Sequence, residues 1–364
     1  MKILHIIYSL SPGGAERFVV DLCNELVERQ HDVTLCVIRD INDSLLGFYR
    51  NEISTKVNLI NYKIKPGINF KISFLLIDSI KKTKADIVHC HLGTIYYLMP
   101  IAFFYRMTKY FYTVHNDASK EYQKFRFFKN LIRYYFKKKL IHPITISTDT
   151  STSFVKYYNL HNFTQIENGR SKNEKTKDFD NVKNEIISIS EGFKTVFLHV
   201  ARFDMQKNQD LLIDCFNELI IDNLPIVLII IGYGFDSRNG IILQKRAKKG
   251  IYFLGTKKNV SDYYLNADAF CLTSIYEGMP ITLIEALSYG CFPICTPVGG
   301  INNVIIDNVN GYLSENMSKD KYIKVLQKYL SNKCNISKEP LIKYFYDNFS
   351  IEKCTQKYID AYKS

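Results

Sequence analysis

The sequence contains no CxxC pair and no Cys/His spacing that fits a zinc site. Its nine cysteines are odd in number, and most of them lie in apolar stretches. Disulfide frameworks and zinc sites both depend on paired, regularly spaced ligands. The cysteines therefore indicate reduced thiols in a cytoplasmic protein and argue against zinc.

No stretch reaches the roughly 18–20 apolar residues that a membrane span requires. The first residues, MKILHIIYSLSPGGAERF, hold only a short apolar run, and PGGAER stands where a signal peptide would be cleaved. We therefore expect neither a secretory leader nor a membrane span, and a protein that is soluble or bound to a membrane surface.

The length of 364 residues suits two domains of ordinary size. Hydrophobic residues make up 46% of the chain and aromatic residues 14%, which favours a globular protein over a disordered one. The net charge of +12 is uneven: residues 1–165 hold 23 Lys and Arg against 13 Asp and Glu. The first half therefore carries most of the positive field.

Apolar, β-branched runs alternate with helical stretches along the chain, which predicts two doubly wound parallel sheets of the Rossmann-like α/β class. The expected strands are 2–8, 32–38, 86–91, 110–116, 143–148, 195–201, 226–232, 251–255, 269–274 and 292–297. A polar, charged stretch over 169–192 interrupts this rhythm. We predict an N-terminal domain over 1–168, a linker over 169–192, a second domain over 193–340 and a C-terminal helix over 341–364 that packs back on the first domain.

Polar clusters follow the expected strands in both halves, and ligands of open α/β sheets bind beyond the carboxyl ends of strands. This convergence predicts a cleft between two Rossmann-like domains. The clusters lie at 9–16, 89–91, 115–117, 202–208, 232–234, 277–280 and 299–300.

The stretch SIYEGMPITLIEALSYG at 274–290 sets two acids eight positions apart around a helix start. Gly278 allows close approach of a ligand, and Pro280 suits the first helical turn. The amides of Ile281, Thr282 and Leu283 would then face an anion, because helix starts attract phosphate. Glu285 can accept hydrogen bonds from a pair of hydroxyls. The alternative is a capping Glu277 and a solvated Glu285.

These residues resemble the E-x7-E region of the GT4 family of retaining glycosyltransferases, which have the GT-B fold. The similarity extends over nearly the whole chain, through GGAER, HCH at 89–91, TVHN at 113–116, ENG at 167–169, ARFDxxKN at 201–208 and PVGG at 297–300. It implies an acceptor-binding first domain, a nucleotide-sugar-binding second domain, no cofactor and no metal.

The resemblance also implies roles for single residues. Arg202 and Lys207 match the basic pair that holds the donor pyrophosphate, which agrees with the fixed positive charge that a departing diphosphate needs. Glu285 matches the acid on the ribose hydroxyls. Glu277 matches the acid beside the donor sugar, where the amides of Gly278 and Met279 assist it. His115 matches a histidine at the donor sugar, and the alternative is a histidine that merely ends a strand.

Several glycines match donor-binding loops of the family. Gly13 and Gly14 correspond to a loop over the donor phosphates, although GGAER is not the dinucleotide fingerprint. Gly255 would face the base, and Gly232 fits either a donor loop or an ordinary turn. The sequence departs from the family pattern at Ala201 and Asn303, where relatives often have Gly and Glu. The second departure concerns donor binding and not the fold.

The stretch KEYQKFRFFKNLIRYYFKKKL at 120–140 is basic and aromatic, without Pro or Gly, and predicts one helix. Such a helix suits an anionic membrane surface. The alternative is a packed helix with a solvated basic face. Nucleic-acid binding would rest on charge alone, and we expect none. The residues assigned to acceptor or membrane contact are Lys124, Arg126, Lys129, Arg133, Lys137, Lys138 and Lys139.

The sequence thus predicts a retaining, metal-independent glycosyltransferase. It would move a hexose-type sugar from a UDP-sugar to a saccharide acceptor, lipid-linked, in bacterial surface polysaccharide synthesis. The expected location is the cytoplasm, at the inner face of the plasma membrane. Two alternatives remain open: a nucleotide-sugar 2-epimerase of the same fold, and a catalytically silent nucleotide-sugar-binding protein.

Overall fold

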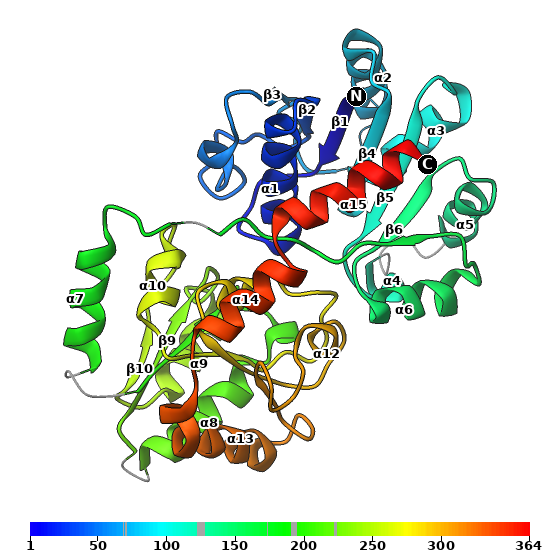
Figure 1. Ribbon diagram of the computed structural model, residues 1–364. Coiled ribbons are helices and arrows are strands. Elements are labelled where there is room, and N and C mark those ends of the chain that lie inside the picture. The colour runs from blue at the N-terminus through cyan, green and yellow to red at the C-terminus, as the bar shows by residue number, and fades with distance from the viewer. Residues whose placement is uncertain (68, 70, 122–127, 173, 191–194, 222–223) are drawn as a thin grey trace. The chain divides into compact units, whose positions relative to one another are not determined.

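The computed structural model describes residues 1–364 except 68, 70, 122–127, 173, 191–194 and 222–223. The chain forms two units, one of residues 1–171 and 351–364 and the other of residues 172–350 (Figure 1). Each unit has its own parallel sheet with helices packed against it. No helix in this described part is both long and apolar enough to cross a bilayer.

The sheet of the first unit has the strand order β3-β2-β1-β4-β5-β6-β7, with every pair parallel. Its strands are β1 (Lys2–Ile7), β2 (Asp32–Val37), β3 (Asn58–Asn61), β4 (Ile87–His91), β5 (Lys109–Val114), β6 (His142–Thr145) and β7 (Thr164–Gln165). Its α-helices are α1 (Gly14–Glu28), α2 (Lys71–Thr83), α3 (Ile95–Phe104), α4 (Ala118–Glu121), α5 (Lys129–Lys137), α6 (Thr148–Tyr158) and α15 (Ile351–Lys363).

Successive side chains of the central strands in the first unit point to opposite faces of the sheet, so its buried residues are divided between two faces. Leu4 and Val88 point into a cluster with Leu76 of α2 and Ile132 of α5. The opposite face carries histidines, one of which contacts α15. Helices α1 and α15 lie side by side there (Figure 1).

The sheet of the second unit has the order β10-β9-β8-β11-β12-β13, again parallel throughout. Its strands are β8 (Thr195–Val200), β9 (Ile226–Ile231), β10 (Ile251–Phe253), β11 (Ala269–Leu272), β12 (Phe292–Cys295) and β13 (Tyr312–Leu313). Its α-helices are α7 (Phe179–Ser190), α8 (Gln209–Ile221), α9 (Arg238–Arg246), α10 (Val260–Asn266), α11 (Ile281–Ser288), α12 (Ile301–Val304), α13 (Lys319–Asn332) and α14 (Glu339–Asn348).

Two expectations from the sequence are wrong. The polar stretch 169–192 is not only linker, because α7 lies inside it and packs on α10 through a buried stripe of Val182, Ile186 and Ser190. The C-terminal helix expected over 341–364 is two helices, α14 in the second unit and α15 in the first. The chain leaves helical geometry between them at Phe349.

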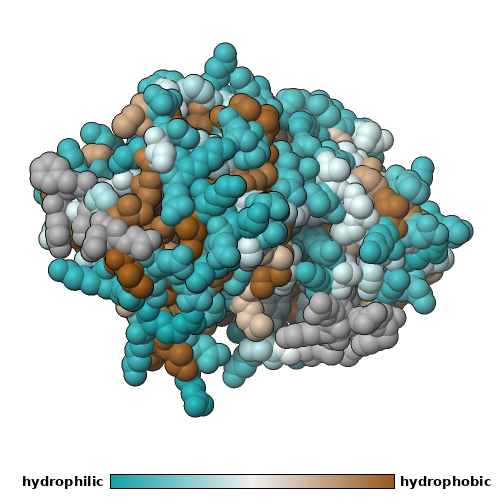
Figure 2. All heavy atoms as spheres, turned by 90° about the horizontal axis from the view of Figure 1, so that it is seen from below, coloured by the Kyte–Doolittle hydropathy of each residue, from teal (hydrophilic) through white to brown (hydrophobic). Residues whose placement is uncertain are grey.

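Hydrophobic residues on the face seen in Figure 2 lie in small groups between hydrophilic ones. A folded protein has too few polar atoms to cover its surface, so scattered apolar side chains need no separate explanation. An exposed apolar group therefore needs a charged or structural context before it indicates a binding surface.

Candidate functional site

Two loops of the second unit are joined by hydrogen bonds beyond the carboxyl ends of β8 and β11. The amide of Ile275 donates to the carbonyl of Gln206 over 2.8 Å, and the Thr273 hydroxyl lies 3.1 Å from the carbonyls of Lys207 and Asn208. Asn208 has a φ of 50°, the left-handed conformation that Asn tolerates. These contacts bring ARFDxxKN and the first acid of the E-x7-E region together.

Glu277 is buried within this junction, with 6% of its side chain exposed. The Lys207 ammonium lies 2.5 Å from Glu277 Oε1, and the Ser274 hydroxyl donates to the same oxygen over 2.6 Å. The Gln206 side-chain amide donates to the Tyr276 carbonyl over 2.9 Å. The carboxylate is therefore held in one orientation, and two protons of the ammonium are left for other acceptors.

Arg202 is half-exposed at the start of the first loop. Its Nε donates to Asp204 Oδ2 over 3.1 Å, and the Gln209 side chain donates to the Arg202 carbonyl over 2.8 Å. Burial opposes the charge of the guanidinium, but Asp204, Tyr233 and Glu277 together outweigh it and raise the pKa of Arg202. The side chain is thus a permanent cation, and its Nη2 also donates to the Gln206 side-chain oxygen over 3.4 Å.

Close backbone approach shapes the loops around this junction. A Cβ at Gly300 would lie 1.7 Å from the Gly278 carbonyl oxygen, and one at Gly299 would lie 2.1 Å from that of Glu277. A Cβ at Gly232 would lie 1.9 Å from the Ala201 carbonyl oxygen. Only glycine fits at these three positions. Gly255 has a φ of 66°, and open space surrounds the place of its missing Cβ.

The helix start after Glu277 differs in detail from the expectation. Pro280 is the N-cap of α11, not its first residue, and its carbonyl accepts the Leu283 amide at 3.2 Å. The Leu283 amide is therefore not available to a ligand, and the first two residues of the turn are the buried Ile281 and the partly exposed Thr282. Met279 is buried beside them.

Glu285 is half-buried one turn into α11. The Tyr264 hydroxyl lies 3.4 Å from Glu285 Oε2 and 3.0 Å from the Thr282 carbonyl oxygen. The tyrosine therefore bridges the helix backbone and the acid. Carboxylate oxygens so placed can accept further hydrogen bonds from hydroxyl groups.

In the first unit, Gly13 is the N-cap of α1 and Gly14 is its first residue. His115 follows β5 and is half-buried, and its Nε2 lies 3.0 Å from Nδ1 of His91. Burial lowers the pKa of His115 to about 3. Its imidazole is therefore neutral under physiological conditions and has one N–H donor.

The single helix expected over 120–140 is also wrong in part. Helices α4 and α5 account for its two ends, and the chain leaves helical geometry after Lys137, since Lys139 has a φ of 53°. Lys124 and Arg126 lie outside the described residues. Lys137, Lys138 and Lys139 are exposed.

Two of the basic residues of α5 contribute to packing. Lys129 places its ammonium 4.4 Å from the centre of the Tyr157 ring, and Arg133 Nε donates to the Tyr158 carbonyl over 2.6 Å. Both partners belong to α6. The packed-helix alternative therefore describes this half of the segment, whereas the last three lysines point to solvent.

Sequence reasoning missed the residues that orient the others: Gln206, Ser274, Tyr264 and the buried His199. His199 Nδ1 lies 2.9 Å from the Cys271 carbonyl oxygen, and burial lowers the pKa of His199 to about 4. The sequence pointed only to Gln206 and Ser274, because they lie within or next to the motifs ARFDxxKN and SIYEGMP. His199 and Tyr264 look like ordinary core residues in the sequence.

Two parallel-sheet α/β units are the arrangement of the GT-B fold, and matches to two family models define the class of protein as a glycosyltransferase. A model described as Glycosyltransferase Family 4 matches residues 12–172, and one described as Glycosyl transferases group 1 matches residues 183–347. The chain belongs to the GT4 family of glycosyltransferases.

Curated relatives cover the chain from end to end. A UDP-Gal:alpha-D-GlcNAc-diphosphoundecaprenol alpha-1,3-galactosyltransferase of Escherichia coli is 24% identical, over 100% of this chain and 96% of its own. The capsular polysaccharide biosynthesis glycosyltransferase CapH of Staphylococcus aureus is 26% identical, over 100% and 99%. The crystal structure of Anabaena Alr3699/HepE in complex with UDP and glucose has a TM-score of 0.81 at 17% identity, over 99% of each chain.

Proposed function

We propose that this glycosyltransferase transfers a hexose-type sugar from a UDP-sugar to a lipid-linked saccharide, with retention of anomeric configuration, during synthesis of a bacterial surface polysaccharide. The names of two relatives support the substrate class: one uses UDP-Gal and a diphosphoundecaprenol-linked sugar, and the other belongs to capsule synthesis. The UDP complex of the Anabaena protein supports a uridine nucleotide.

The junction of Lys207 with Glu277 carries the proposal for donor binding. Lys207 and Arg202 would hold the diphosphate and stabilise the charge that develops on it as the glycosidic bond breaks. Glu277 would orient the donor sugar while the ammonium keeps its carboxylate in place. Glu285 would accept hydrogen bonds from the ribose hydroxyls.

We propose that the acceptor hydroxyl attacks from the face on which the diphosphate leaves, which retains the configuration without a covalent intermediate. A donor phosphate oxygen would take the proton of that hydroxyl, through an oxocarbenium-like transition state. A neutral His115 suits a role in orienting the sugar. No residue of this scheme needs a metal ion, and we propose a metal-independent transfer.

A membrane surface is proposed for the first unit, at the inner face of the plasma membrane. Phe104, the last residue of α3, and Met107, which follows the helix, have 81% and 82% of their surface exposed. These exposed apolar side chains and the exposed Lys137, Lys138 and Lys139 of the same unit together have the composition that binds anionic bilayers.

The test incubates the purified protein with UDP-sugars, singly, and a diphosphoundecaprenol-linked GlcNAc acceptor, with and without EDTA. We expect one extended lipid-linked product, an anomeric proton coupling that matches that of the donor, and no loss of rate in EDTA. An inverted product or a metal requirement contradicts the corresponding part of the proposal. An isomerised donor in the absence of acceptor would instead identify a 2-epimerase, and donor binding without turnover a silent protein.

A further inference from the structure

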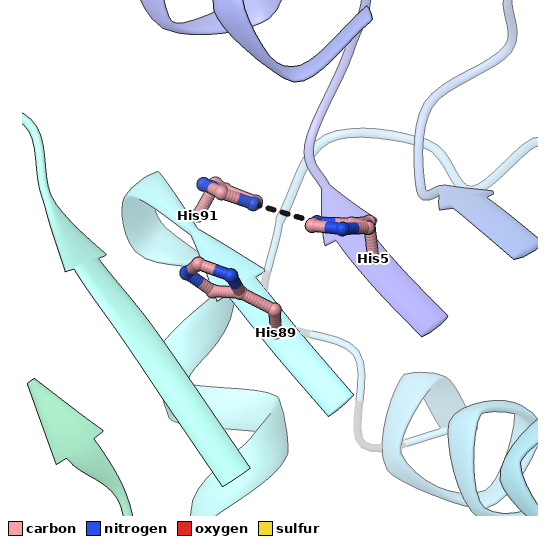
Figure 3. A group of neighbouring side chains, drawn as sticks. All are labelled: His5, His89 and His91. Atoms are coloured by element: carbon pink, nitrogen blue, oxygen red, sulfur yellow. Dashed lines mark hydrogen bonds between the residues drawn. The ribbon is translucent and has the colours of Figure 1, made fainter. Parts of the chain in front are cut away.

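Four histidines of the first unit lie on one face of its sheet. His5 of β1 pairs in register with His89 of β4, and His91 follows two residues later on the same face. His115 stands just beyond β5. Figure 3 shows His5 and His91 joined through their ring nitrogens, with His89 beside them.

Three of these rings form a hydrogen-bonded chain. His5 Nδ1 lies 3.1 Å from His91 Nε2, and His91 Nδ1 lies 3.0 Å from His115 Nε2. The first two rings are fully buried, and the third is half-buried at the carboxyl end of the sheet. Burial lowers the pKa of His5 to about 3 and that of His91 well below its ordinary value, so these imidazole rings are neutral near pH 7.

A neutral imidazole has one donor and one acceptor nitrogen. The two hydrogen bonds between the three rings must therefore both run in the same direction, either from His5 toward His115 or from His115 toward His5. If His5 donates to His91, then His91 donates to His115, and the proton of His115 sits on Nδ1. If the order is reversed, the proton of His115 sits on Nε2 and His5 carries its own on Nε2. The surroundings of His5 Nε2 therefore decide the tautomer of His115.

His5 Nε2 is buried, and the described residues offer it no hydrogen-bond partner. Buried N–H donors without an acceptor are rarer in proteins than acceptors without a donor. The favoured arrangement thus leaves Nε2 of His5 unprotonated. We propose that His5 and His91 are positioning residues that hold His115 as the Nδ1–H tautomer, which donates a hydrogen bond to a sugar or phosphate oxygen and cannot act as a general base. This inference rests on the proposed function only for the identity of the oxygen.

A metal ion is the competing occupant of these nitrogens, because His5, His89 and His91 offer ligand atoms within 4.8 Å of one another. The hydrogen bonds of His89 oppose it: Nδ1 lies 2.6 Å from the Tyr362 hydroxyl and Nε2 lies 2.8 Å from Thr113 Oγ1. The rings of His89 and His91 are also stacked, with centroids 4.3 Å apart and planes at 27°. Lone pairs of stacked rings lie in nearly parallel planes and do not converge on one ion.

The direct test is the tautomer in the free protein, which needs no substrate. Two-bond ¹H–¹⁵N spectra of histidine-labelled protein at pH 7 should show His115 protonated at Nδ1, with the signal assigned by its absence in His115→Gln. Protonation at Nε2, or an imidazolium, overturns the proposal. Stoichiometric binding of Co²⁺ with a tetrahedral absorption spectrum that His5→Gln abolishes also overturns it, since the nitrogens would then be metal ligands.

The functional test compares two substitutions of His91. His91→Leu removes the contact with His115 and should lower kcat roughly 10- to 100-fold, with a much smaller change in the KM of the donor. His91→Asn can place an amide donor where Nδ1 lies and should keep most of the rate. Tyr362→Phe is the matched control, because it removes a hydrogen bond of His89 and leaves the hydrogen bonds between the other three histidines intact.

The outcomes separate this inference from the proposed function. An unchanged kcat in His91→Leu, or an equal loss in Tyr362→Phe, overturns the positioning role. A fully active His115→Ala variant overturns instead the proposed role of His115 in transfer, and the measured tautomer of the free protein is independent of that result.

Discussion

The ammonium of Lys207 and the carboxylate of Glu277 lie 2.5 Å apart, with 13% and 6% of their side chains exposed. The two residues are 70 positions apart in the chain, and they join the loops after β8 and β11. A pair this buried has a structural effect as well as a proposed catalytic one. Removal of either charge leaves the other without compensation.

We expect Lys207→Met to destabilise the second unit by roughly 3 kcal/mol, because Glu277 then remains charged and buried. The double variant Lys207→Met/Glu277→Gln should recover much of this loss. Urea unfolding followed by circular dichroism measures both. Lys319→Met, which breaks the exposed pair with Glu218, is the control and should leave the midpoint nearly unchanged. Equal midpoints for all variants would contradict the idea that the pair holds the loops together.

Arg202→Ala should weaken UDP binding roughly 10- to 100-fold, since a charge-assisted hydrogen bond to phosphate contributes about 1.5–3 kcal/mol. Titration calorimetry with UDP gives the affinity directly. Arg246→Ala is a matched control in the same unit, because Arg246 pairs with Asp214 on an exposed helix surface. If both variants bind UDP as the parent does, Arg202 does not contact the diphosphate.

Glu285→Ala should lower the affinity for UDP roughly tenfold and leave that for inorganic pyrophosphate unchanged, because only the nucleotide offers ribose hydroxyls. Competition binding with the two ligands separates these effects. Glu218→Ala, an exposed acid of α8, serves as the control. A parallel loss for both ligands would place Glu285 near the phosphates or in the structure of α11.

The strands that the sequence predicts best are buried on both faces. The run at 226–231 is continuous Ile, Val and Leu, as parallel strands between helix layers require. The short edge strands β3, β7 and β13 were not predicted, because NLIN, TQ and YL are too short for any period. Helix α7 was missed although Val182, Ile186 and Ser190 recur every four residues, since the charged residues of the surrounding stretch 169–192 suggested a loop.

In the candidate site, too, the sequence predicted residues that belong to local motifs but not the contacts that depend on the fold. Local motifs identified Arg202, Glu277 and Glu285, but the pairing of Glu277 with Lys207 depends on how two loops fold against each other. His5 stands in an apolar strand, and no spacing within the sequence relates it to His91. Such contacts arise from sheet register, which places residues 86 positions apart side by side.

Substitution of Lys137, Lys138 and Lys139 by Ala should weaken binding to phosphatidylglycerol vesicles roughly 100-fold, at about 1 kcal/mol for each cation near the surface. Phe104→Ser/Met107→Ser should weaken binding also at high salt, where electrostatic attraction is screened. Vesicle sedimentation measures both. The variant with Ala at Lys81, Lys82 and Lys84 changes the formal charge equally on α2 and after its end, and it should bind as the parent does. Equal loss in that variant would show only an effect of net charge.

Acid should unfold the first unit before the second, because the histidines with lowered pKa values are concentrated there. Burial lowers the pKa of His5 and His115 to about 3, and those of His89 and His91 well below the ordinary value near 6.5. Among the described residues, His199 is the one histidine of the second unit with such a shift, to about 4.

The sign of this pH dependence follows from proton uptake. Each of these histidines is neutral in the fold and takes up a proton in the unfolded chain below about pH 6.5, so its stabilisation is complete above that pH and is lost as the pH falls toward the folded pKa. The loss is about 1.4 kcal/mol per pH unit for each histidine. Hydrogen exchange at pH 7 and pH 5, corrected for intrinsic rates, should show a larger loss of protection in β1, β4 and β5 than in β8 and β11. His161→Gln, at an exposed position, should not change this difference. Earlier loss of protection in the second unit would mean that the four buried or half-buried histidines of the first unit do not govern acid stability.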